Sequence, residues 1–268
     1  MKARILWNTR TKTRCDLRLM EYAPGSRQPP HAHARDSITI VLRGDLIEGS
    51  DRGEERACAL SVVAKPSGVE HENLFGPRGA RTLQIELPSE RRHWTPQMPR
   101  ASASWEHAGP ACRALLRLLV RLDFDAREAS CRAEALVHQT LAGLSFASSS
   151  QADPPRWLME LRVALEREAT TSMAGLAHRV GMHPVYVARR FRAQFGVSPT
   201  AFRARLRAQR AARALLDADD SLGSVALDAG YFDQPHMNRQ IRTITGLTPR
   251  TLRAVSGLSN GPETRGAA

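Results

Sequence analysis

The sequence predicts an α+β protein with more than one domain, in which a β-barrel precedes an all-α domain. Short segments rich in leucine and β-branched residues, separated by glycine and proline, occupy residues 1–108. Apolar residues with helical spacing begin near Gly109, and one helical pattern then occurs twice within residues 156–255. A chain of 268 residues also exceeds a typical single domain, which has about 100–200 residues.

The amino-terminal domain is expected to consist of short strands. These are predicted at residues 15–22, 37–43, 45–48, 57–64 and 82–87. Gly44 is expected to break the chain between two of them. Short strands at regular spacing favour a small β-barrel or sandwich, so we assign a barrel to residues 1–108.

Residues 109–147 are expected to form two amphipathic helices, joined near residues 123–125. Their apolar stripes contain Leu115, Leu116, Leu118, Leu119 and Leu122, followed by Leu136, Leu141 and Leu144. The second stripe needs a partner, which is either the barrel of the same chain or the same helix of a second subunit. We therefore describe this segment as a candidate dimerisation segment.

A linker and a tail are expected on either side of the carboxy-terminal domain. Residues 148–155 combine serines with two prolines, as linkers do. We therefore expect few contacts between the parts of the chain that the linker joins. Residues 256–268 are predicted to be disordered.

An internal repeat lies in residues 156–255. The sequence LAHRVG at residues 176–181 aligns with VALDAG at residues 225–230, and residues 183–199 align with residues 233–249. Packing requirements alone rarely produce the same pattern twice in tandem. The repeat therefore favours a functional unit over a plain helical bundle with solvated arginines.

Each copy of the repeat predicts a short helix, a turn at glycine and a second helix, which together form a helix-turn-helix. The two units are expected at about residues 172–195 and 221–245. Ser172 and Ser221 are candidate caps of the first helices, and Asp233 of the last one.

The second helix of each copy has an inner and an outer face. Val187 and Phe191 in the first copy, like Met237 and Ile241 in the second, lie four residues apart and are expected to face the core. The outer faces then contain Val185, Ala188, Arg189 and Arg192 in the first copy, and Gln234, Pro235, Asn238, Arg239 and Arg242 in the second.

A long helix from Pro199 to about Leu216 is expected to connect the two units. Its inner face would contain Phe202, Leu206 and Leu216, with arginines elsewhere. The net charge of the whole chain is +12, and residues 156–255 hold sixteen arginines against eight acidic residues. This local excess of positive charge favours binding to phosphate groups.

These residues resemble the DNA-binding domain of the AraC/XylS family of bacterial transcription regulators, from about residue 157 to 255. The resemblance is carried by Leu176-Ala177, Gly181, Arg189, Phe191, Gly196-Val197-Ser198-Pro199, Arg207, Ala211, Leu215, Ala226, Gly230-Tyr231, Asp233-Gln234, His236-Met237, Arg239 and Gly246-Leu247-Thr248-Pro249-Arg250. Departures occur at Met237 and Ile241, where the family usually has phenylalanine, and at His183 and Pro235, where it often has serine.

The resemblance implies a sequence-specific DNA-binding regulator, in the commoner case an activator. The two recognition helices would enter successive major grooves of double-stranded DNA and present the outer faces described above. It further implies a homodimer formed through the amino-terminal part, and RNA polymerase is a further candidate partner. No catalysis is implied, so the protein is not expected to be an enzyme.

Three histidines in the barrel region resemble part of the two cupin motifs. His31 and His33 follow Gly25, and His71 follows Pro66 and Gly68. Ser37, however, stands where a metal-binding cupin places glutamate. We therefore expect a pocket for a small effector at the three histidines, with no metal and no cofactor.

Two alternatives stay open for the function. In the first, the three imidazoles hold a metal, and the protein is a cupin metalloenzyme with a DNA-binding appendage. In the second, the barrel only dimerises, and the protein binds DNA without an effector. The sequence itself does not identify an effector or a target promoter.

Several other classes of protein are disfavoured. No apolar run approaches the roughly 18–20 residues of a membrane span, and no hydrophobic signal core follows the start of the sequence. We therefore expect a cytoplasmic protein. Cys15, Cys58, Cys112 and Cys131 form no C-x-x-C pair, which favours reduced thiols over a zinc cluster.

Overall fold

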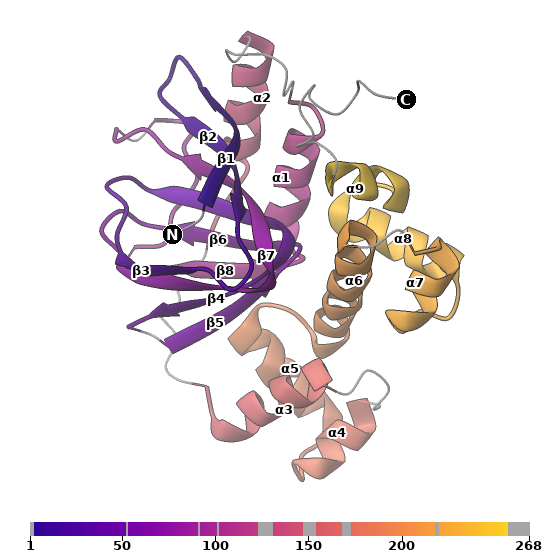
Figure 1. The fold of residues 1–268 in the computed structure, drawn as a ribbon. Coiled ribbons are helices and arrows are strands. Elements are labelled where there is room, and N and C mark those ends of the chain that lie inside the picture. The colour runs from indigo at the N-terminus through magenta and orange to yellow at the C-terminus, as the bar shows by residue number, and fades with distance from the viewer. Residues whose placement is uncertain are drawn as a thin grey trace.

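The computed structural model describes residues 3–51, 53–90, 92–100, 102–122, 131–146, 154–167, 173–217 and 220–256. Within these residues, a β domain is followed by helices only. Figure 1 shows helices α1 (Pro110–Leu119) and α2 (Cys131–Ala142) beside the β domain, and two further groups of helices around α6 (Pro199–Asp217). The α+β class and the order of the domains are as predicted.

The β domain is an antiparallel sheet that curls on itself. Its strands are β1 (Ala3–Arg10), β2 (Asp16–Tyr22), β3 (Arg27–His31), β4 (Ser37–Ser50), β5 (Gly53–Cys58), β6 (Ser61–Lys65), β7 (His71–Glu86) and β8 (Ser104–His107). They pair in the order β1-β2-β7-β4-β6-β8, while β3 also pairs with β7 and β5 with β4. The long strands β4 and β7 therefore belong to both halves of the curled sheet.

The expected break at Gly44 is a bend within β4. The pairing of β4 with β7 shifts register on both sides of this residue, as β-bulges do. Gly44 has φ +73°, and a Cβ atom there would lie 2.0 Å from the carbonyl oxygen of Gly79. The two predicted strands on either side of Gly44 are thus one continuous strand, because glycine permits the bend and the close approach.

The two faces of the sheet have different surroundings. One face packs against α1 and α2 and contributes Leu17, Leu19, Ile38, Ile40, Leu83 and Ile85 to the main hydrophobic core. The other face encloses a mostly polar interior, with a smaller apolar cluster around Tyr22, Val41 and Phe75. This division follows from the alternation of side chains along each strand.

The apolar stripes of α1 and α2 are buried within the same chain. Leu115, Leu116 and Leu119 on α1, together with Val137 and Leu141 on α2, are at most 1% exposed. The first of the two expected partners, the chain's own β domain, therefore covers these stripes. Dimerisation stays a prediction, and the expected joint near residues 123–125 lies outside the described residues.

The expectation of few contacts across the linker is wrong. Helices α7 (Leu222–Asp228), α8 (Gln234–Thr245) and α9 (Pro249–Ser256) share one hydrophobic core with α1 and the β domain. In Figure 1, these helices lie beside α1 and α6. Direct contacts join α1 to α8, and β4 to both α6 and α9. Most of the linker, residues 148–153, lies outside the described residues.

Asp217, at the end of α6, links the helical domain to the β domain. Its carboxylate is only 4% exposed and lies 2.9 Å from Arg78 and 3.4 Å from Arg43 of the β domain, with Arg213 of α6 at 3.8 Å. A carboxylate at a helix C-terminus is unfavourable by itself, because the helix dipole is negative there. The three guanidinium groups offset this cost and fix α6 against the β domain.

We expect the substitution Asp217→Asn to reduce the free energy of unfolding by about 1–3 kcal/mol. The loss is smaller than for a fully buried pair because the arginines remain partly exposed. Urea denaturation of the full chain measures it. Glu160→Gln, which removes an exposed i,i+4 ion pair with Arg156, is the control and should change stability by less than about 0.5 kcal/mol. Equal effects of the two substitutions would contradict the proposed role of Asp217.

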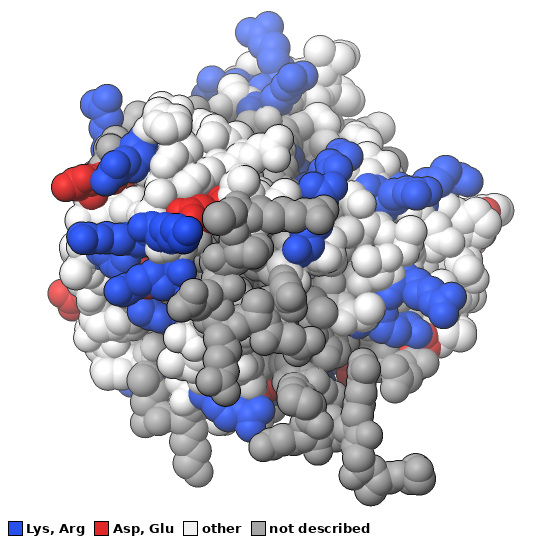
Figure 2. All heavy atoms as spheres, turned by 90° about the horizontal axis from the view of Figure 1, so that it is seen from above, with Lys and Arg blue, Asp and Glu red and all other residues white. Residues whose placement is uncertain are grey.

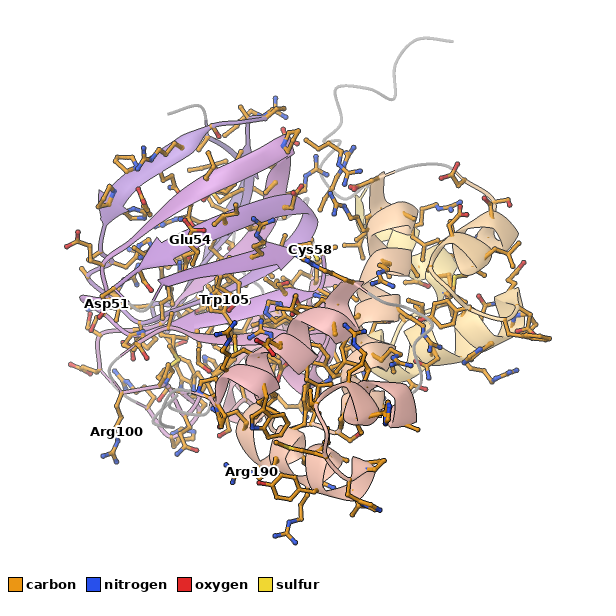
Figure 3. All side chains as sticks on the ribbon, turned by 90° about the horizontal axis from the view of Figure 1, so that it is seen from below. Asp51, Glu54, Cys58, Arg100, Trp105 and Arg190 are labelled. Carbon is orange, nitrogen blue, oxygen red and sulfur yellow. The ribbon has the colours of Figure 1, made fainter. Side chains whose placement is uncertain are left out.

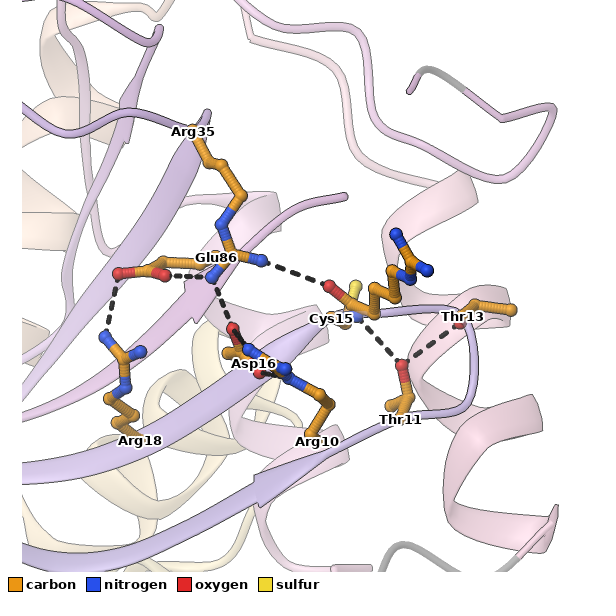
Figure 4. A network of polar contacts seen from close by, with 9 residues as sticks. Arg10, Thr11, Thr13, Cys15, Asp16, Arg18, Arg35 and Glu86 are labelled. Carbon is orange, nitrogen blue, oxygen red and sulfur yellow. Dashed lines mark hydrogen bonds and ion pairs between the residues drawn. The ribbon is translucent and has the colours of Figure 1, made fainter. Parts of the chain in front are cut away.

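A second polar network holds the start of β2 (Figure 4). Asp16 accepts hydrogen bonds from Arg10, at 2.9 Å, and from Arg35. Arg35 also binds Glu86 on β7, and Glu86 in turn accepts from Arg18 at 2.8 Å. Hydrogen bonds from Arg10 and Arg35 lower the pKa of the buried Asp16 carboxyl to about 2 despite its desolvation. The network thereby anchors the segment that carries His33.

The Asp16 network should contribute about 2 kcal/mol to stability at neutral pH, because the pKa of Asp16 is depressed in the folded state. This contribution is complete above pH 4 and is lost as the pH falls towards 2. The Asp16→Asn variant should therefore have a lower free energy of unfolding than the unsubstituted protein at pH 7. The difference between the two free energies should become smaller from pH 4 to pH 2. Denaturation across this range tests the prediction, with the exposed Asp51→Asn as control. A difference independent of pH would refute it.

Candidate nucleic-acid interface and interior cavity

The first helix-turn-helix unit has a small core of its own. It consists of α3 (Arg156–Arg167), α4 (Met173–Arg179) and α5 (Pro184–Phe195). Its buried residues are Leu158, Leu161, Leu165, Leu176, Ala177, Val187 and Phe191. One ion pair, between Arg162 and Glu55 at 3.3 Å, joins this unit to β5. The expected cap Ser172 lies outside the described residues.

The turn between the two helices has the same backbone hydrogen bond and the same left-handed glycine in both units. The N–H of Met182 donates to Ala177 O at 3.1 Å, and the N–H of Tyr231 donates to Ala226 O at 2.9 Å. The turn glycines have φ of +66° (Gly181) and +82° (Gly230). The repeat seen in the sequence is therefore a repeat of structure.

The recognition helices α5 and α8 also begin and end in the same way. The His183 ring accepts from the N–H of Val185 at 3.3 Å, and the Asp233 carboxylate accepts from the N–H of His236 at 2.6 Å. Both helices have proline in the first turn and end at a left-handed glycine. Such caps satisfy backbone groups that a helix terminus leaves unpaired, so each helix is fixed in place and length.

The inner faces of the recognition helices are as predicted. Val187, Phe191, Met237 and Ile241 are completely buried. On the outer faces, the exposed residues are Val185, Arg189 and Arg192 in α5, and Gln234, Pro235, Arg239 and Arg242 in α8. Ala188 and Asn238 are half-buried.

The four arginines on these outer faces make no ion pair within the described residues, so their guanidinium groups are available to an anionic partner. Figure 2 shows that lysine and arginine also outnumber acidic residues on the face seen from above. A basic surface with unpaired guanidinium groups is suited to phosphate and to the edges of guanine bases.

The sequence analysis missed several exposed residues near the recognition helices. Arg190 points into solvent from the outer side of α5, away from the β domain (Figure 3). Tyr186 is 48% exposed and stacks on Trp157, and Phe232, just before α8, is 89% exposed. The helical period alone identifies Arg190 as a neighbour of the outer face, but no sequence pattern indicates an exposed phenylalanine.

The three predicted histidines come together at a cavity of about 140 Å³ inside the β domain. His31 and His71 are direct cross-strand partners on β3 and β7. The ring centroids are 4.4 Å apart for this pair, and His33 lies 5.2 Å from each of the other two. Further residues line the cavity, among them Tyr22, Thr39, Glu48, Lys65, Phe75, Gln84 and Trp105.

Burial controls the charges in this cavity. Desolvation, with a smaller contribution from Lys65, lowers the pKa of His71 to about 3, and it also lowers the pKa of His33. These two imidazoles are therefore neutral at pH 7. Lys65 and Glu48 form a buried ion pair at 2.5 Å. The sequence analysis missed this pair because both residues occur singly within otherwise apolar strands.

A second cavity, of about 440 Å³, lies between the β domain and the helical domain. Trp105, His107, Arg162, Phe195, Arg205 and Gln209 are among its lining residues. Trp105 borders this cavity as well as the interior one. Trp105 therefore lies between the interior cavity of the β domain and the cavity beside the helical domain.

Comparisons with known proteins agree with the geometry of the helical domain. A family model described as a helix-turn-helix domain matches residues 176–254. No curated protein matches the chain by sequence. Within the described residues, no helix has both the length and the apolar character needed to cross a membrane.

The chain is also similar to several solved structures. An AraC-type transcriptional regulator from Chromobacterium violaceum is 26% identical, over 40% of this chain and 94% of that one, with a TM-score of 0.35. The DNA-binding domain of AdpA, solved with a target DNA, is 30% identical over 38% of this chain and 92% of its own, with a TM-score of 0.34. An apo variant of ToxT from Vibrio cholerae covers 92% of this chain and 99% of its own, at 8% identity and a TM-score of 0.39.

The carboxy-terminal part of this chain is a helix-turn-helix DNA-binding domain. In this domain the chain resembles transcription regulators of the AraC type.

Proposed function

We propose that this protein is a transcription regulator of the AraC family, which reads two successive major grooves of promoter DNA and responds to a small effector held inside its β domain. The observation that carries the proposal is the structural repeat, in which two capped recognition helices present unpaired arginines. Helix α6 has 19 residues and is therefore about 28 Å long. A helix of this length is suited to holding two reading units apart by about one turn of DNA, 34–36 Å.

The outer-face residues have different proposed roles. Arg189, Asn238 and Arg239 would contact base edges, whereas Arg192 and Arg242 would contact phosphates. The remaining outer-face residues, Val185, Ala188, Gln234 and Pro235, would complete the surface that enters the groove. Because Asn238 is half-buried, the two arginines carry most of the expected base recognition.

The interior cavity supports the effector part of the proposal. Its lining combines aromatic rings with hydrogen-bonding groups, as in many ligand sites. Its volume of about 140 Å³ lies below the range of typical ligand pockets, which favours a small effector. Activation of transcription, a homodimer and contact with RNA polymerase rest on the sequence resemblance and complete the proposal. A cytoplasmic location is proposed because the sequence has no apolar run long enough to span a membrane.

We expect Arg239→Ala to weaken binding to a cognate DNA by about 1–3 kcal/mol and to relax base preference at one position. Arg242→Ala should instead weaken binding to all sequences alike and lower the salt slope by about one, because it removes a phosphate contact. Cognate DNA selected from a random library, followed by titrations at several salt concentrations, measures both. Arg4→Ala, on an exposed arginine of β1, is the control. Unchanged affinity and base preference in Arg239→Ala would refute the assignment.

The effector proposal predicts that His71→Ala abolishes the response to the effector while DNA binding without effector stays intact. Couplings of this kind usually correspond to changes of about 5- to 150-fold in affinity or output. A reporter gene under a promoter found by mapping bound sites in the genome gives the readout. His178→Ala, an exposed histidine of α4, serves as the control. An unchanged dose response in His71→Ala would place the effector elsewhere or exclude one.

A further inference from the structure

We infer that Phe232 contacts the methyl group of a thymine in the major groove and is an apolar specificity residue of the second helix-turn-helix unit. This role rests on the proposed function, because it requires that α8 enters a major groove. It adds a residue that lies outside the recognition helix, which begins at Gln234. Phe232 also has no equivalent in the first unit, so the two units would read DNA differently.

Phe232 is an additional residue between the turn and the recognition helix of the second unit. In the first unit, Met182 alone separates the turn glycine from the cap of α5, whereas Tyr231 and Phe232 separate the glycine from the cap of α8 in the second. The N–H that closes the turn belongs to Met182 in one unit and to Tyr231 in the other, so these two residues are equivalent. The residue without a counterpart is therefore Phe232.

The residues on both sides of Phe232 are held in place, so the exposed position of its ring is built into the fold. Tyr231 is only 4% exposed and packs edge-on against the His236 ring, with 5.2 Å between the ring centroids. Asp233 caps α8 by accepting from the N–H of His236 at 2.6 Å. Phe232 itself is 89% exposed, more than any other large apolar side chain of the described residues.

The place of this ring in the unit indicates its partner. Single apolar residues are common on protein surfaces and need no partner as a rule. Phe232, however, stands directly before the cap of α8, and the N-terminal residues of a recognition helix are those that contact base edges. Gln234 and Pro235, in the first turn of α8, are exposed as well. The ring therefore continues the surface that the proposed function assigns to the groove.

The chemistry of the side chain indicates which base it would contact. Phenylalanine has no hydrogen-bonding group in its side chain, so it cannot read the donors and acceptors of a base edge. Thymine is distinguished in the major groove by its 5-methyl group, and phenylalanine is among the side chains that contact this group. Arg239 and Arg242 of the same helix make no ion pair within the described residues, which favours an anionic partner over an apolar protein surface. DNA offers phosphates to the arginines and a methyl group to the ring.

The test uses the full chain and a cognate duplex that it selects from a random DNA library. Each thymine of this duplex is replaced in turn by deoxyuridine, which removes only the 5-methyl group. At one position or more, the replacement should weaken binding of the unsubstituted protein about fourfold, the factor that corresponds to one buried methylene group. At one of these positions, Phe232→Ala should bind the thymine and deoxyuridine duplexes equally. Phe232→Leu, which keeps an apolar side chain, should retain part of the difference.

Leu227→Ala, at another exposed apolar residue of the second unit, is the matched control and should keep the full sensitivity to deoxyuridine. Thermal denaturation should give equal melting temperatures for all variants, because both side chains are exposed. Binding of the unsubstituted protein that ignores every replacement, or unchanged sensitivity in Phe232→Ala, would overturn the role of Phe232 alone. Normal DNA binding by Phe232→Ala with reduced reporter output would also overturn it and favour a protein partner. Failure of the unsubstituted protein to select any duplex would instead overturn the proposed function, and this role with it.

Discussion

The close packing of α6 is the constraint on which the rest of the structure depends. Ala208, Ala211 and Ala212 are fully buried along this helix. Small side chains at these positions let α6 pack closely against β4, α8 and α9. Arg213, a half-buried arginine of α6, then reaches the carboxylate of Asp45 on β4 at 3.4 Å. Both helix-turn-helix units and the β domain are positioned by this one helix.

The two helix-turn-helix units are consequently alike in structure but differ in attachment. The second unit is part of the main core and lies against α1, where Arg113 donates to Thr243 O of α8 at 3.3 Å. The first unit keeps a separate core and is joined to the β domain by the Arg162 to Glu55 ion pair. A change in the β domain therefore reaches the second unit through rigid packing. The same change would reach the first unit through α6 and through the ion pair between Arg162 and Glu55. We therefore expect regulation to act mainly on the angle between the two helix-turn-helix units.

The sequence predicted the helical domain well because its signals are local and repeated. Glycine turns, caps and apolar pairs four residues apart each depend on a few neighbouring residues, and both copies carry them. The packing of the helical domain against the β domain could not be predicted from the sequence. The alanines of α6 form no strongly apolar stripe, and its arginines are typical of a solvent-exposed face. Strand β3 was missed since two prolines within five residues argue against a strand. The histidine cluster was expected from the resemblance to the cupin motifs, but its partners Glu48 and Lys65 depend on strand register, which local sequence does not determine.

The glycines that end the two recognition helices differ in the space around them, because only the second helix packs against α1. Around Gly196, a Cβ atom would meet nothing within 4 Å, whereas at Gly246 it would lie 3.1 Å from Arg117 and 3.3 Å from Arg113 of α1. Both positions require a left-handed backbone, which asparagine also tolerates. Residue 196 can therefore be replaced by asparagine without a steric conflict. At residue 246, a side chain would also have to fit against α1. Equivalent positions of the two copies therefore accept different substitutions, because only one of them packs against α1.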